Sequence, residues 1–361
     1  MKVLFQNADT GDSFEFDSTE TDLRIRDIAY TVMQQYEIEK PPIFFTIYKE
    51  KPTSETILEE DTLINSILEK KLDEKTPIWF HSSELHADMI YKLRTERFEM
   101  SGYKISEINK KSILIAGVGL IGADLAVHCA TIGFKKLFVI DYGSIDWYNI
   151  YRQSLYHKKD VFQPKVEVAR SNLEEYGGLE VIPLRIEIPS FISTYHDSQE
   201  IEAALDTIES YITQADYIIT ALDTFSARMI IQTLALANEK PLINTAAGLI
   251  GGVVQLVRPD LDPCLACGVY FERTQDIGAC TLATFGTPKV IAGLAIDLLL
   301  DVIENRVIDF NHLKFSPNYE LEKGLFEKGS SCAFCDDTTG IIAQYKMGTK
   351  RALIDWLLKS D

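Results

Sequence analysis

A glycine-rich turn near the middle of the chain is followed, about twenty residues later, by an acidic side chain. The turn is Gly117-Val-Gly119-Leu-Ile-Gly122 and the acid is Asp141. Glycines between a strand and a helix let backbone N–H groups approach phosphates, and the helix N-terminus favours their negative charge. An acid at this separation is placed to bind ribose hydroxyls. Together these features predict a nucleotide-binding site, but they do not separate NAD from ATP.

Three long polar side chains, Arg152, Gln153 and Lys165, follow the acid closely. The triphosphate of ATP needs cations, and attack at its α-phosphate builds negative charge that Arg and Lys stabilise. Asp223 ends a predicted strand at the carboxyl edge of the sheet, where a carboxylate near a triphosphate would hold Mg²⁺. Taken alone, each cation could be a solvated surface charge, and Asp223 could be the N-cap of the next helix. Taken together, these residues favour Mg-ATP over NAD.

Four of the six cysteines form two Cys-x-x-Cys pairs, Cys264 with Cys267 and Cys332 with Cys335. The chain begins with no basic-then-apolar export signal, and in that context such pairs predict metal ligands before disulfides. Four thiolates suit tetrahedral Zn²⁺, which would join the C-terminal tail to the rest of the chain and add folding free energy. Reduced structural thiols and redox-active pairs are the alternatives.

The other two cysteines have different surroundings. Cys280 lies in a segment rich in glycine and threonine, ahead of a predicted helix at residues 289–303. A loop cysteine whose pKa is lowered can be the nucleophile that forms a thioester, and a purely structural cysteine is the alternative. Cys129 lies on an apolar predicted helix, so we expect it in the core.

Strands and helical stretches alternate from residue 112 onward, which is the pattern of a mostly parallel α/β sheet. We predict a Rossmann-like sheet with helices on both faces. The predicted helices at 121–132 and 225–237 follow the glycine turn and Asp223. The predicted strands are residues 113–116, 137–140, 181–186, 217–222, 242–245 and 252–257, and the last is expected to return antiparallel.

The first 84 residues have a separate pattern of short strands around an amphipathic helix. This order resembles the ubiquitin-like β-grasp fold, and a winged-helix peptide-recognition domain is the alternative. No Gly-Gly tail ends the segment, so we expect a recruiting module and not a conjugated modifier. The predicted strands are residues 2–6, 13–17, 43–48 and 77–81, with helices at 23–36 and 61–68. The predicted domains are 1–84, 85–325 and a zinc-knuckle tail at 326–361.

The complete set of motifs resembles the ubiquitin-activating-enzyme-like adenylyltransferases, the ThiF/MoeB superfamily, over about residues 92–340. The family also has an Arg-x-x-Arg upstream of the glycine loop, which Arg94 and Arg97 match. The resemblance implies a homodimer in which Arg97 reaches the partner's ATP site, and a helix-surface charge is the alternative. The family's glycine loop matches Gly117, Gly119 and Gly122, and its ribose-binding Asp matches Asp141. Its Asn-x-x-Arg-Gln element matches Asn149, Arg152 and Gln153. Its Lys matches Lys165 and its strand-end Asp matches Asp223.

The same resemblance bears on the cysteines. Around Cys280 the chain is similar to the ubiquitin-fold-modifier-activating enzymes, whose catalytic cysteine lies in a comparable stretch. Other relatives complete their reaction from the acyl-adenylate without such a cysteine, and many carry cysteine pairs at the places seen here. Three positions depart from the family, because Leu120 and Phe162 replace glycines and Gly143 replaces a second acid. These departures affect the expected shape of the loops more than the chemistry.

The net charge of −18 limits the partners of the chain. Residues 1–84 hold 18 acidic and 9 basic residues, so half of the excess lies in less than a quarter of the chain. This balance argues against nucleic acid, which needs Lys and Arg to replace phosphate counterions, and suits a basic protein partner or solubility alone. The most apolar stretch, residues 290–303, is too short to span a bilayer. We therefore expect a cytoplasmic protein with no membrane partner.

These observations lead us to expect ATP-dependent adenylation of the C-terminal carboxylate of a ubiquitin-like or sulfur-carrier protein with a flexible tail. Thioester formation on Cys280 would follow if that residue is a nucleophile. The main alternative is a short ribosomal peptide as the acyl substrate, with the N-terminal module holding a leader peptide. A non-catalytic scaffold would leave the Arg, Lys and Asp set unexplained. An NAD oxidoreductase would leave Arg152, Gln153 and the cysteine pairs unexplained.

Overall fold

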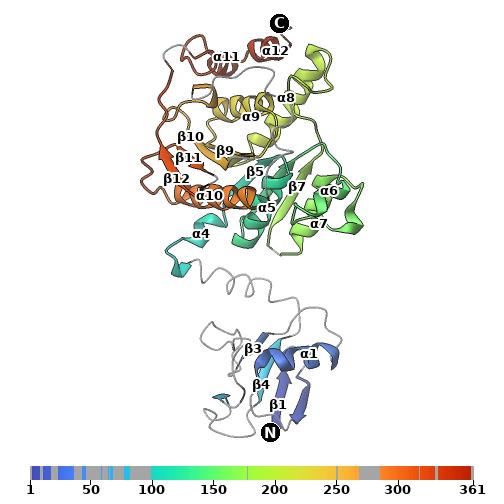
Figure 1. Cartoon of the computed structure of the whole chain (residues 1–361). Helices are drawn as coiled ribbons and strands as arrows, with labels where there is room; N and C mark the ends of the chain where they lie inside the picture. Colours follow the sequence, from blue (N-terminus) through green and yellow to red (C-terminus); the bar gives the residue numbers. More distant parts are fainter. Residues whose placement is uncertain are drawn as a thin grey trace. The chain divides into compact units, whose positions relative to one another are not determined.

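The chain divides into two compact units, Met1–Leu93 and Arg94–Asp361, in the computed structural model (Figure 1). Each unit has its own sheet and its own buried apolar core. None of the helices described is long and apolar enough to cross a membrane. The structure describes residues 2–8, 11–17, 23–35, 43–45, 58, 64, 66–67, 77–81, 99–176, 178–248, 251–267, 285–316, 318–329 and 332–358.

The described residues of the N-terminal unit include a four-stranded sheet and the helix α1 (Ile25–Gln35). Strand β1 pairs antiparallel with β2 and parallel with β4, as a β-grasp arrangement requires. Its core joins apolar residues of the sheet and of α1. The small α+β unit is therefore confirmed, while residues 46–48 and most of 61–68 lie outside the described ranges. The strands are β1 (Lys2–Asn7), β2 (Ser13–Asp17), β3 (Ile43–Phe45) and β4 (Ile78–His81), in the order β2-β1-β4-β3.

The second unit contains an eight-stranded sheet in the order β12-β11-β10-β9-β8-β5-β6-β7. The five strands from β9 to β7 run parallel, and β10 returns antiparallel to β9 as predicted. Strands β11 and β12, which the sequence pattern did not reveal, extend the antiparallel edge. The strands are β5 (Ser112–Ala116), β6 (Lys136–Ile140), β7 (Glu180–Leu184), β8 (Tyr217–Thr220), β9 (Leu242–Gly248), β10 (Gly251–Val257), β11 (His312–Phe315) and β12 (Leu321–Gly324).

Helices cover both faces of this sheet, which confirms the predicted fold class (Figure 1). Helix α10 packs on α5 and on β9, whereas α9 packs on α8, β8 and β9 and carries the C-terminal helix α11 on its outer side. The main helices are α5 (Leu120–Ile132), α7 (Lys165–Glu174), α8 (Ser198–Ile212), α9 (Phe225–Ala237), α10 (Gly286–Ile303), α11 (Ile341–Lys346) and α12 (Arg351–Leu358), and the shorter ones are α4 (Ile105–Ile108), α6 (Trp147–Ile150), η2 (Lys158–Asp160) and η3 (Leu265–Cys267).

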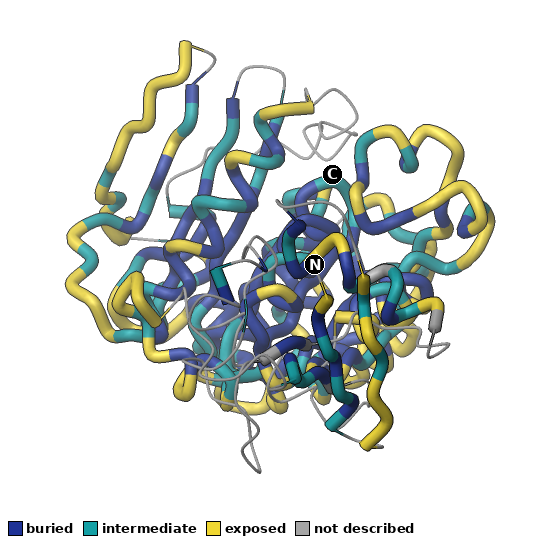
Figure 2. The backbone as a smooth tube through the Cα atoms, turned by 90° about the horizontal axis from the view of Figure 1, so that it is seen from below, coloured by how far each residue is buried: buried dark blue, intermediate teal, exposed yellow. Residues whose placement is uncertain are grey.

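The central parallel strands are buried on both faces, as expected for a sheet that helices cover on both sides (Figure 2). Along β5, Leu114 and Ala116 belong to the core shared with α8, α9 and the C-terminal helices. Ile113 and Ile115 are also fully buried, and they point to the opposite face because side chains alternate along a strand. Since both faces are filled, a ligand must approach this sheet at its strand ends.

Candidate functional site

The strand order of the large sheet creates a crevice beside β5. Strand β5 pairs in parallel with β6 on one side and with β8 on the other. The chain runs from β5 through β6 to β7 at one edge and then crosses to β8 on the opposite side of β5, so the strand order reverses at β5. Ligands of open α/β sheets bind outside the carboxyl ends of the strands at such a switch point. Here the glycine turn follows β5, Asp141 follows β6, and the segment with Asp223 follows β8.

The three glycines of the turn have different structural roles. Gly117 has a φ of +91°, and a Cβ there would lie 2.6 Å from the carbonyl oxygen of Ala221. A Cβ on Gly122 would lie 1.8 Å from the carbonyl oxygen of Gly117. Gly119 precedes the first residue of α5 and faces open space on the wall of the cleft. Gly117 and Gly122 therefore shape the turn, while Gly119 keeps room for a ligand.

Asp141 connects the end of β6 to the glycine turn. One carboxylate oxygen accepts a hydrogen bond from the N–H of Val118 at 2.9 Å, and the other accepts from the N–H of Gly143 at 2.7 Å. Each carboxylate oxygen has a second lone pair, so Asp141 can still accept hydrogen bonds from sugar hydroxyls. Gly143 also lies against Lys165, because a Cβ on it would be 3.7 Å from the lysine Nζ. A larger residue at 143 would therefore enter the space between Asp141 and Lys165.

Helix α6 arranges the Asn-x-x-Arg-Gln element. Asn149 is buried, its side-chain oxygen accepts from the N–H of Asp146, and its carbonyl accepts from the N–H groups of Arg152 and Gln153. Gln153 is only 4% exposed, yet its Oε1 has no hydrogen-bond partner among the described residues. An orphaned buried acceptor on the wall of a cleft is a group that a ligand or water must satisfy.

Charged groups face the crevice from several elements. Lys165 begins α7, and its backbone N–H donates to the carbonyl of Gly143 at 3.0 Å. Asp223 lies three residues beyond the end of β8, not at the strand end as predicted, and it is exposed. It is not the N-cap of α9 either, because that position belongs to Thr224. Its carboxylate has no hydrogen-bond or ion-pair partner within the described ranges, which leaves it available to a cation.

The pKa of Tyr142 indicates that carboxylates gather in this crevice. Its pKa is raised above the usual 10.0, first by burial and then by the nearby carboxylates of Asp223, Glu187 and Asp141. Three carboxylates around one phenol create a negative region, which a divalent cation would neutralise. Sequence reasoning missed Tyr142, Tyr148 and Glu187 as parts of this site. The adjacency of Tyr142 to the predicted ribose acid was the available signal for that residue.

Together these groups line a cleft with a volume of about 410 Å³. This volume is within the range of small-molecule sites, which run from about 300 to 1,000 Å³. Arg152 additionally lies over the ring of Tyr148, with 5.8 Å between its guanidinium carbon and the ring centroid. Gly122 is the one predicted nucleotide-site residue that is absent from the lining, since it packs behind the turn. The predicted residues that line the cleft are Gly117, Gly119, Asp141, Asn149, Arg152, Gln153, Lys165 and Asp223.

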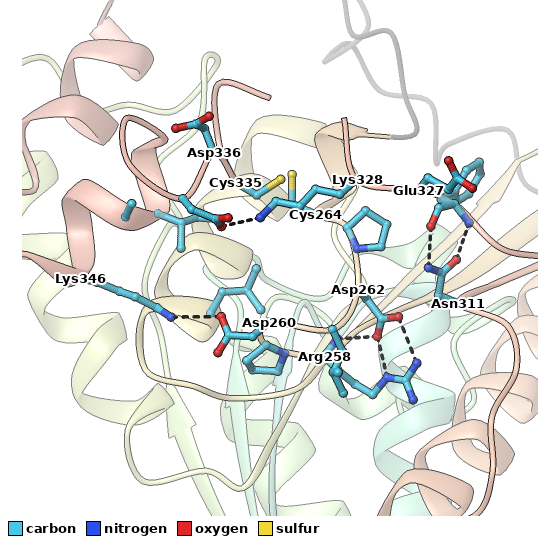
Figure 3. A pocket seen from close by; sticks show the side chains of 18 of the residues that line it. Arg258, Asp260, Asp262, Cys264, Asn311, Glu327, Lys328, Cys335, Asp336 and Lys346 are labelled. Atoms are coloured by element: carbon cyan, nitrogen blue, oxygen red, sulfur yellow. Dashed lines mark hydrogen bonds and ion pairs between the residues drawn. The ribbon is translucent and has the colours of Figure 1, made fainter. Parts of the chain in front are cut away.

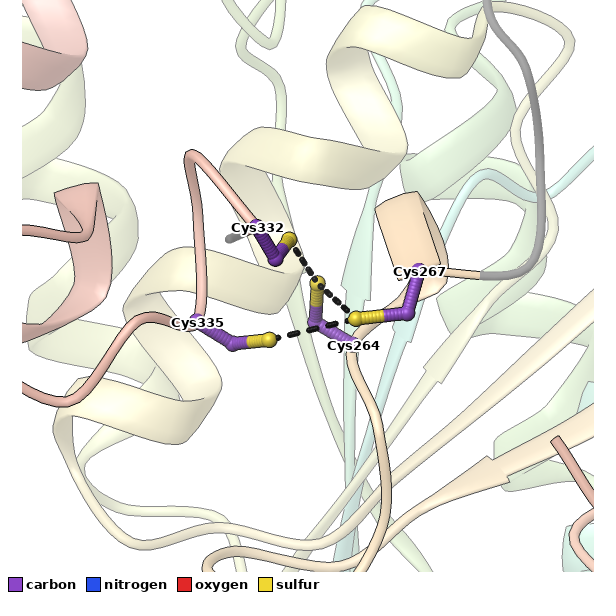
Figure 4. Close-up of side chains that lie close together, drawn as sticks. All are labelled: Cys264, Cys267, Cys332 and Cys335. Carbon is purple, nitrogen blue, oxygen red and sulfur yellow. Dashed lines mark hydrogen bonds between the residues drawn. The ribbon is translucent and has the colours of Figure 1, made fainter. Parts of the chain in front are cut away.

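The two cysteine pairs meet beside α9 (Figure 4). Their four Sγ atoms lie within 4.8 Å of one another, with 3.8 Å between Cys264 and Cys267, 3.5 Å between Cys264 and Cys332, and 3.3 Å between Cys267 and Cys335. A tetrahedral Zn²⁺ with Zn–S bonds of about 2.3 Å places its sulfurs about 3.8 Å apart. The donor set and its spacing therefore fit such an ion.

The ionisation of the cluster is uneven. The pKa of the Cys335 thiol is lowered to about 5, first by a hydrogen bond from Cys264. The pKa of the Cys264 thiol is raised, first by that same hydrogen bond and then by burial. A thiolate is the form that binds metals, so the lowered pKa of Cys335 favours metal binding by the cluster.

A second cavity, of about 520 Å³, lies next to the cluster (Figure 3). Most of its charged lining forms ion pairs within the cavity: Arg258 with Asp262 at 2.6 Å, Lys328 with Asp337 at 2.5 Å, and Lys346 with Asp260 at 3.8 Å. Asn311 bonds the backbone N–H and carbonyl of Phe326. Because most of these charged groups pair with one another, the structure favours a ligand in the crevice at β5 over one in this cavity.

Three predicted residues lie outside the described ranges, namely Arg94, Arg97 and Cys280. Cys129 is fully buried on α5, and burial raises its pKa, so the expectation of a core cysteine is confirmed. The structure describes Leu120 and Phe162, the two residues that replace glycines of the resembling family. Leu120 is the first residue of α5, while Phe162 takes a left-handed φ of +71° with its ring exposed.

The glycine turn, the acid after β6 and the Arg-Gln element sit on one crevice, and residues 92–332 match the ThiF family. The chain belongs to the ThiF family. The resemblance inferred from the motifs is thereby confirmed.

Two curated ThiF-type relatives illustrate the range of similar proteins. The adenylyltransferase and sulfurtransferase MOCS3 of Aedes aegypti is 27% identical over 254 residues, which are 65% of this chain and 52% of that protein. The NEDD8-activating enzyme E1 catalytic subunit of Arabidopsis thaliana is 33% identical over 181 residues, which are 49% of this chain and 38% of that protein. The ThiF chain thus spans about half the length, or less, of these relatives.

Solved structures share the ThiF fold. E. coli MccB with MccA-N7isoASN superimposes with a TM-score of 0.54 at 19% identity, covering 64% of this chain and 69% of that one. E. coli MccB with ATP gives a TM-score of 0.52 at 18% identity, covering 63% and 68%. At these identities the likeness establishes the fold.

Proposed function

We propose that this ThiF-family chain adenylates the carboxylate at the C-terminus of a ubiquitin-like protein, a sulfur-carrier protein or a peptide with a flexible tail, and that it uses Mg-ATP. The observation that carries the proposal is the meeting of Arg152, Lys165 and Asp223 with the glycine turn at one crevice. Curated relatives named as adenylyltransferases and as modifier-activating enzymes support it.

Each group in the crevice has a role in this reaction. The turn around Gly119 would receive the phosphates, and Asp141 would accept hydrogen bonds from the ribose. Arg152 and Lys165 would neutralise the charge that builds on the phosphates, and Asp223 would hold Mg²⁺. In the first step a carboxylate oxygen of the substrate bonds to the α-phosphorus, and the bond from that phosphorus to the bridging oxygen breaks. The products are an acyl-adenylate and pyrophosphate.

This step needs no general base, because a carboxylate is already ionised at neutral pH. Catalysis then consists of positioning and of stabilising charge. Gln153 would satisfy its orphaned Oε1 with a donor from the nucleotide or an ordered water. We further propose that the four cysteines hold structural Zn²⁺ and that the chain forms a homodimer to which Arg97 contributes across the interface. In a second step the thiolate of Cys280 would attack the acyl carbon of the acyl-adenylate, which forms a thioester and releases AMP.

The alternative acyl substrate is a short ribosomal peptide. The chain shares its fold with MccB, a structure of which contains MccA-N7isoASN. The small sheet of residues Met1–Leu93 would then hold a leader segment of that peptide. The two substrates differ in a measurable way, because one is a folded protein with a free tail and the other is a peptide alone.

ATP–pyrophosphate exchange tests the proposal. Purified protein with Mg²⁺ is mixed with candidate partners encoded near its gene, and exchange is expected with one of them. A Gly-Gly-ending protein or a short peptide, as the active partner, would identify the substrate class. ATP binding without exchange for any candidate would contradict adenylation of these substrates and favour a scaffold.

The variant Asp223→Ala should lower exchange about 100-fold or more, because one electrostatic contact in the transition state is lost. Its control is Asp309→Ala, an exposed aspartate outside the crevice. Circular dichroism checks that both variants are folded. Exchange at the wild-type rate in Asp223→Ala would contradict the assignment of Asp223 as the ligand of Mg²⁺.

A further inference from the structure

Three aromatic rings connect the cysteine cluster to the wall of the crevice. Trp356 of α12 is the middle ring, and its centroid lies 4.9 Å from that of Phe334 in an edge-to-face arrangement. Phe334 is buried and lies between Cys332 and Cys335 in the sequence, within the second Cys-x-x-Cys turn. The position of this ring therefore depends on how the turn that carries the two thiols is held.

Trp356 also contacts the loop that forms one wall of the crevice. Its ring centroid lies 4.7 Å from that of Phe191. The residues on either side of Phe191, Ser190 and Ile192, line the crevice. The backbone N–H of Phe191 donates to Ser226 Oγ at 3.1 Å, and Ser226 is fully buried in the first turn of α9. The wall loop is thus supported by Trp356 and by the start of α9.

Helix α9 also supports the cysteine end of this chain of rings. The N–H of Leu265, between Cys264 and Cys267, donates to Gln232 Oε1 at 2.6 Å, and Gln232 is fully buried. Ser226 and Gln232 are six residues apart on α9, or about 9 Å at 1.5 Å per residue. The same helix begins two residues after Asp223. Helix α9 therefore reaches from the cysteine cluster to the crevice. The rings of Phe334, Trp356 and Phe191 form a second connection between them that does not run through α9.

We propose that Trp356 is a positioning residue through which metal occupancy of the cysteine cluster sets the nucleotide affinity of the crevice. A bound ion holds the 332–335 turn, which keeps Phe334 against the ring of Trp356. Trp356 in turn holds Phe191 and the adjacent wall residues. Packed aromatic contacts transmit such changes because interiors are close-packed and resist small displacements. This inference rests on the proposed function, since it assigns nucleotide binding to the crevice and metal binding to the cluster.

Binding free energies that are coupled must be coupled equally in both directions. Metal should tighten the binding of Mg-ATP, and Mg-ATP should tighten the binding of Zn²⁺ by the same factor. Isothermal titration of Mg-ATP into the zinc-loaded protein and into protein stripped by a zinc chelator, which is then removed, measures this factor. We expect Mg-ATP to bind about fivefold or more weakly after stripping, which is the lower end of typical coupling.

Variants at Trp356 separate this role from general stability. Trp356→Leu should weaken Mg-ATP binding in the zinc-loaded protein and abolish the effect of stripping, whereas Trp356→Phe should retain much of both. The control is Leu353→Ala on the same helix, a fully buried residue whose loss should lower Tm but leave the affinity unchanged. Unchanged Mg-ATP affinity in zinc-loaded Trp356→Leu would overturn the proposal, as would an equal effect of stripping in Trp356→Leu and the wild type.

A spectroscopic measurement gives a second readout. The chain has three tryptophans, so Trp79→Phe together with Trp147→Phe leaves Trp356 as the reporter. Its emission should shift on zinc removal and also on addition of Mg-ATP. A response to zinc alone would contradict the coupling. A wild-type protein that binds no nucleotide would instead refute the proposed function. A protein that binds nucleotide equally well in its zinc-loaded and zinc-stripped forms would refute only this inference.

Discussion

Gly119 and Gly122 belong to one sequence motif but are needed for different physical reasons. A Cβ at 122 would overlap the carbonyl oxygen of Gly117, whereas a Cβ at 119 would meet open space in the crevice. We expect Gly122→Ala to lower the free energy of unfolding by about 3 kcal/mol, as overpacking does. Gly119→Ala should leave Tm nearly unchanged and weaken Mg-ATP binding about tenfold or more, because its methyl group fills phosphate space.

Thermal melts and nucleotide titrations of the two variants check this difference. Equal losses of stability in both would show that Gly119 shapes the turn as well. Wild-type affinity in Gly119→Ala would place the phosphates elsewhere in the crevice.

Phe162 occupies a position where the motif resemblance leads us to expect glycine. It has a φ of +71° and an exposed ring, so it carries backbone strain without much packing to offset it. Left-handed backbone costs a non-glycine residue about 1–2 kcal/mol, although glycine also makes the unfolded chain more flexible. We expect Phe162→Gly to be more stable than Phe162→Ala by about 1 kcal/mol in chemical denaturation. Equal stability of the two variants would mean that the backbone at 162 is not strained.

At the scale of elements, a partly buried ion pair joins α5 to α10. Lys289 Nζ lies 2.5 Å from Asp124 Oδ1, which also accepts from Ser154 Oγ at 2.5 Å. The side chain of Asp124 is 7% exposed and that of Lys289 is 32% exposed. The pair therefore connects the glycine-turn helix, the residue after Gln153 and the beginning of α10.

Lys289→Met should lower the free energy of unfolding by about 2 kcal/mol, less than for a fully buried pair, because it leaves the Asp124 carboxylate without its cation. Adding Asp124→Asn should recover most of this loss, since the uncompensated charge is removed. A matched control is Lys110→Met, which breaks an exposed pair with Glu107 and should leave stability unchanged. Additive losses in the double variant, measured by denaturant titration, would contradict the coupling.

The same helix pair contains His128, whose pKa is lowered below 6.5, first by burial and also by the charge of Lys289. Asp124 and Asp297 act in the opposite direction. The unfolded chain then binds more protons than the folded protein between the folded pKa and 6.5, so this contribution to stability is lost as pH falls below 6.5. Melting curves between pH 7.5 and 5.5 should show a smaller pH dependence for His128→Gln than for the wild type. An identical dependence would exclude His128 as a source.

At the scale of the whole molecule, the cysteine cluster joins parts of the chain that are 68 residues apart, as from Cys264 to Cys332. Zinc would bind the cluster in the folded protein and not in the unfolded chain, so its binding free energy would add to folding. Chelation should release about one zinc per chain and lower Tm by about 5–10 °C. Cys335→Ser should lower Tm similarly, and chelation should then have little further effect. A full additional loss on chelation of Cys335→Ser would place the stabilising ion elsewhere.

Local pattern was enough to predict much of this protein. The alternation of strands and helices, the antiparallel return of β10 and the burial of Cys129 follow from short-range periodicity, and the structure confirms them. The glycine turn, Asp141 and the Arg-Gln element were recognisable because their chemistry depends on spacing along the chain. Such features need only neighbours in sequence, which is why a single sequence reveals them.

Other features were settled only by the tertiary structure. Strands β11 and β12 are short and polar, so their pairing with the sheet edge left little signal in the sequence. Asn149 lines the crevice, and its backbone carbonyl also accepts hydrogen bonds from the N–H groups of Arg152 and Gln153. Asp223 lies three residues beyond the end of β8.

The sequence by itself determined which residues can do chemistry: a turn for phosphates, long cations, acids and four thiols. The tertiary structure decided which of them meet. The thiols come together across a long separation, and Trp356 stands between a cysteine turn and a crevice wall that are distant in sequence. Contacts of this kind depend on how helices pack on a sheet, and no periodicity within one segment encodes them.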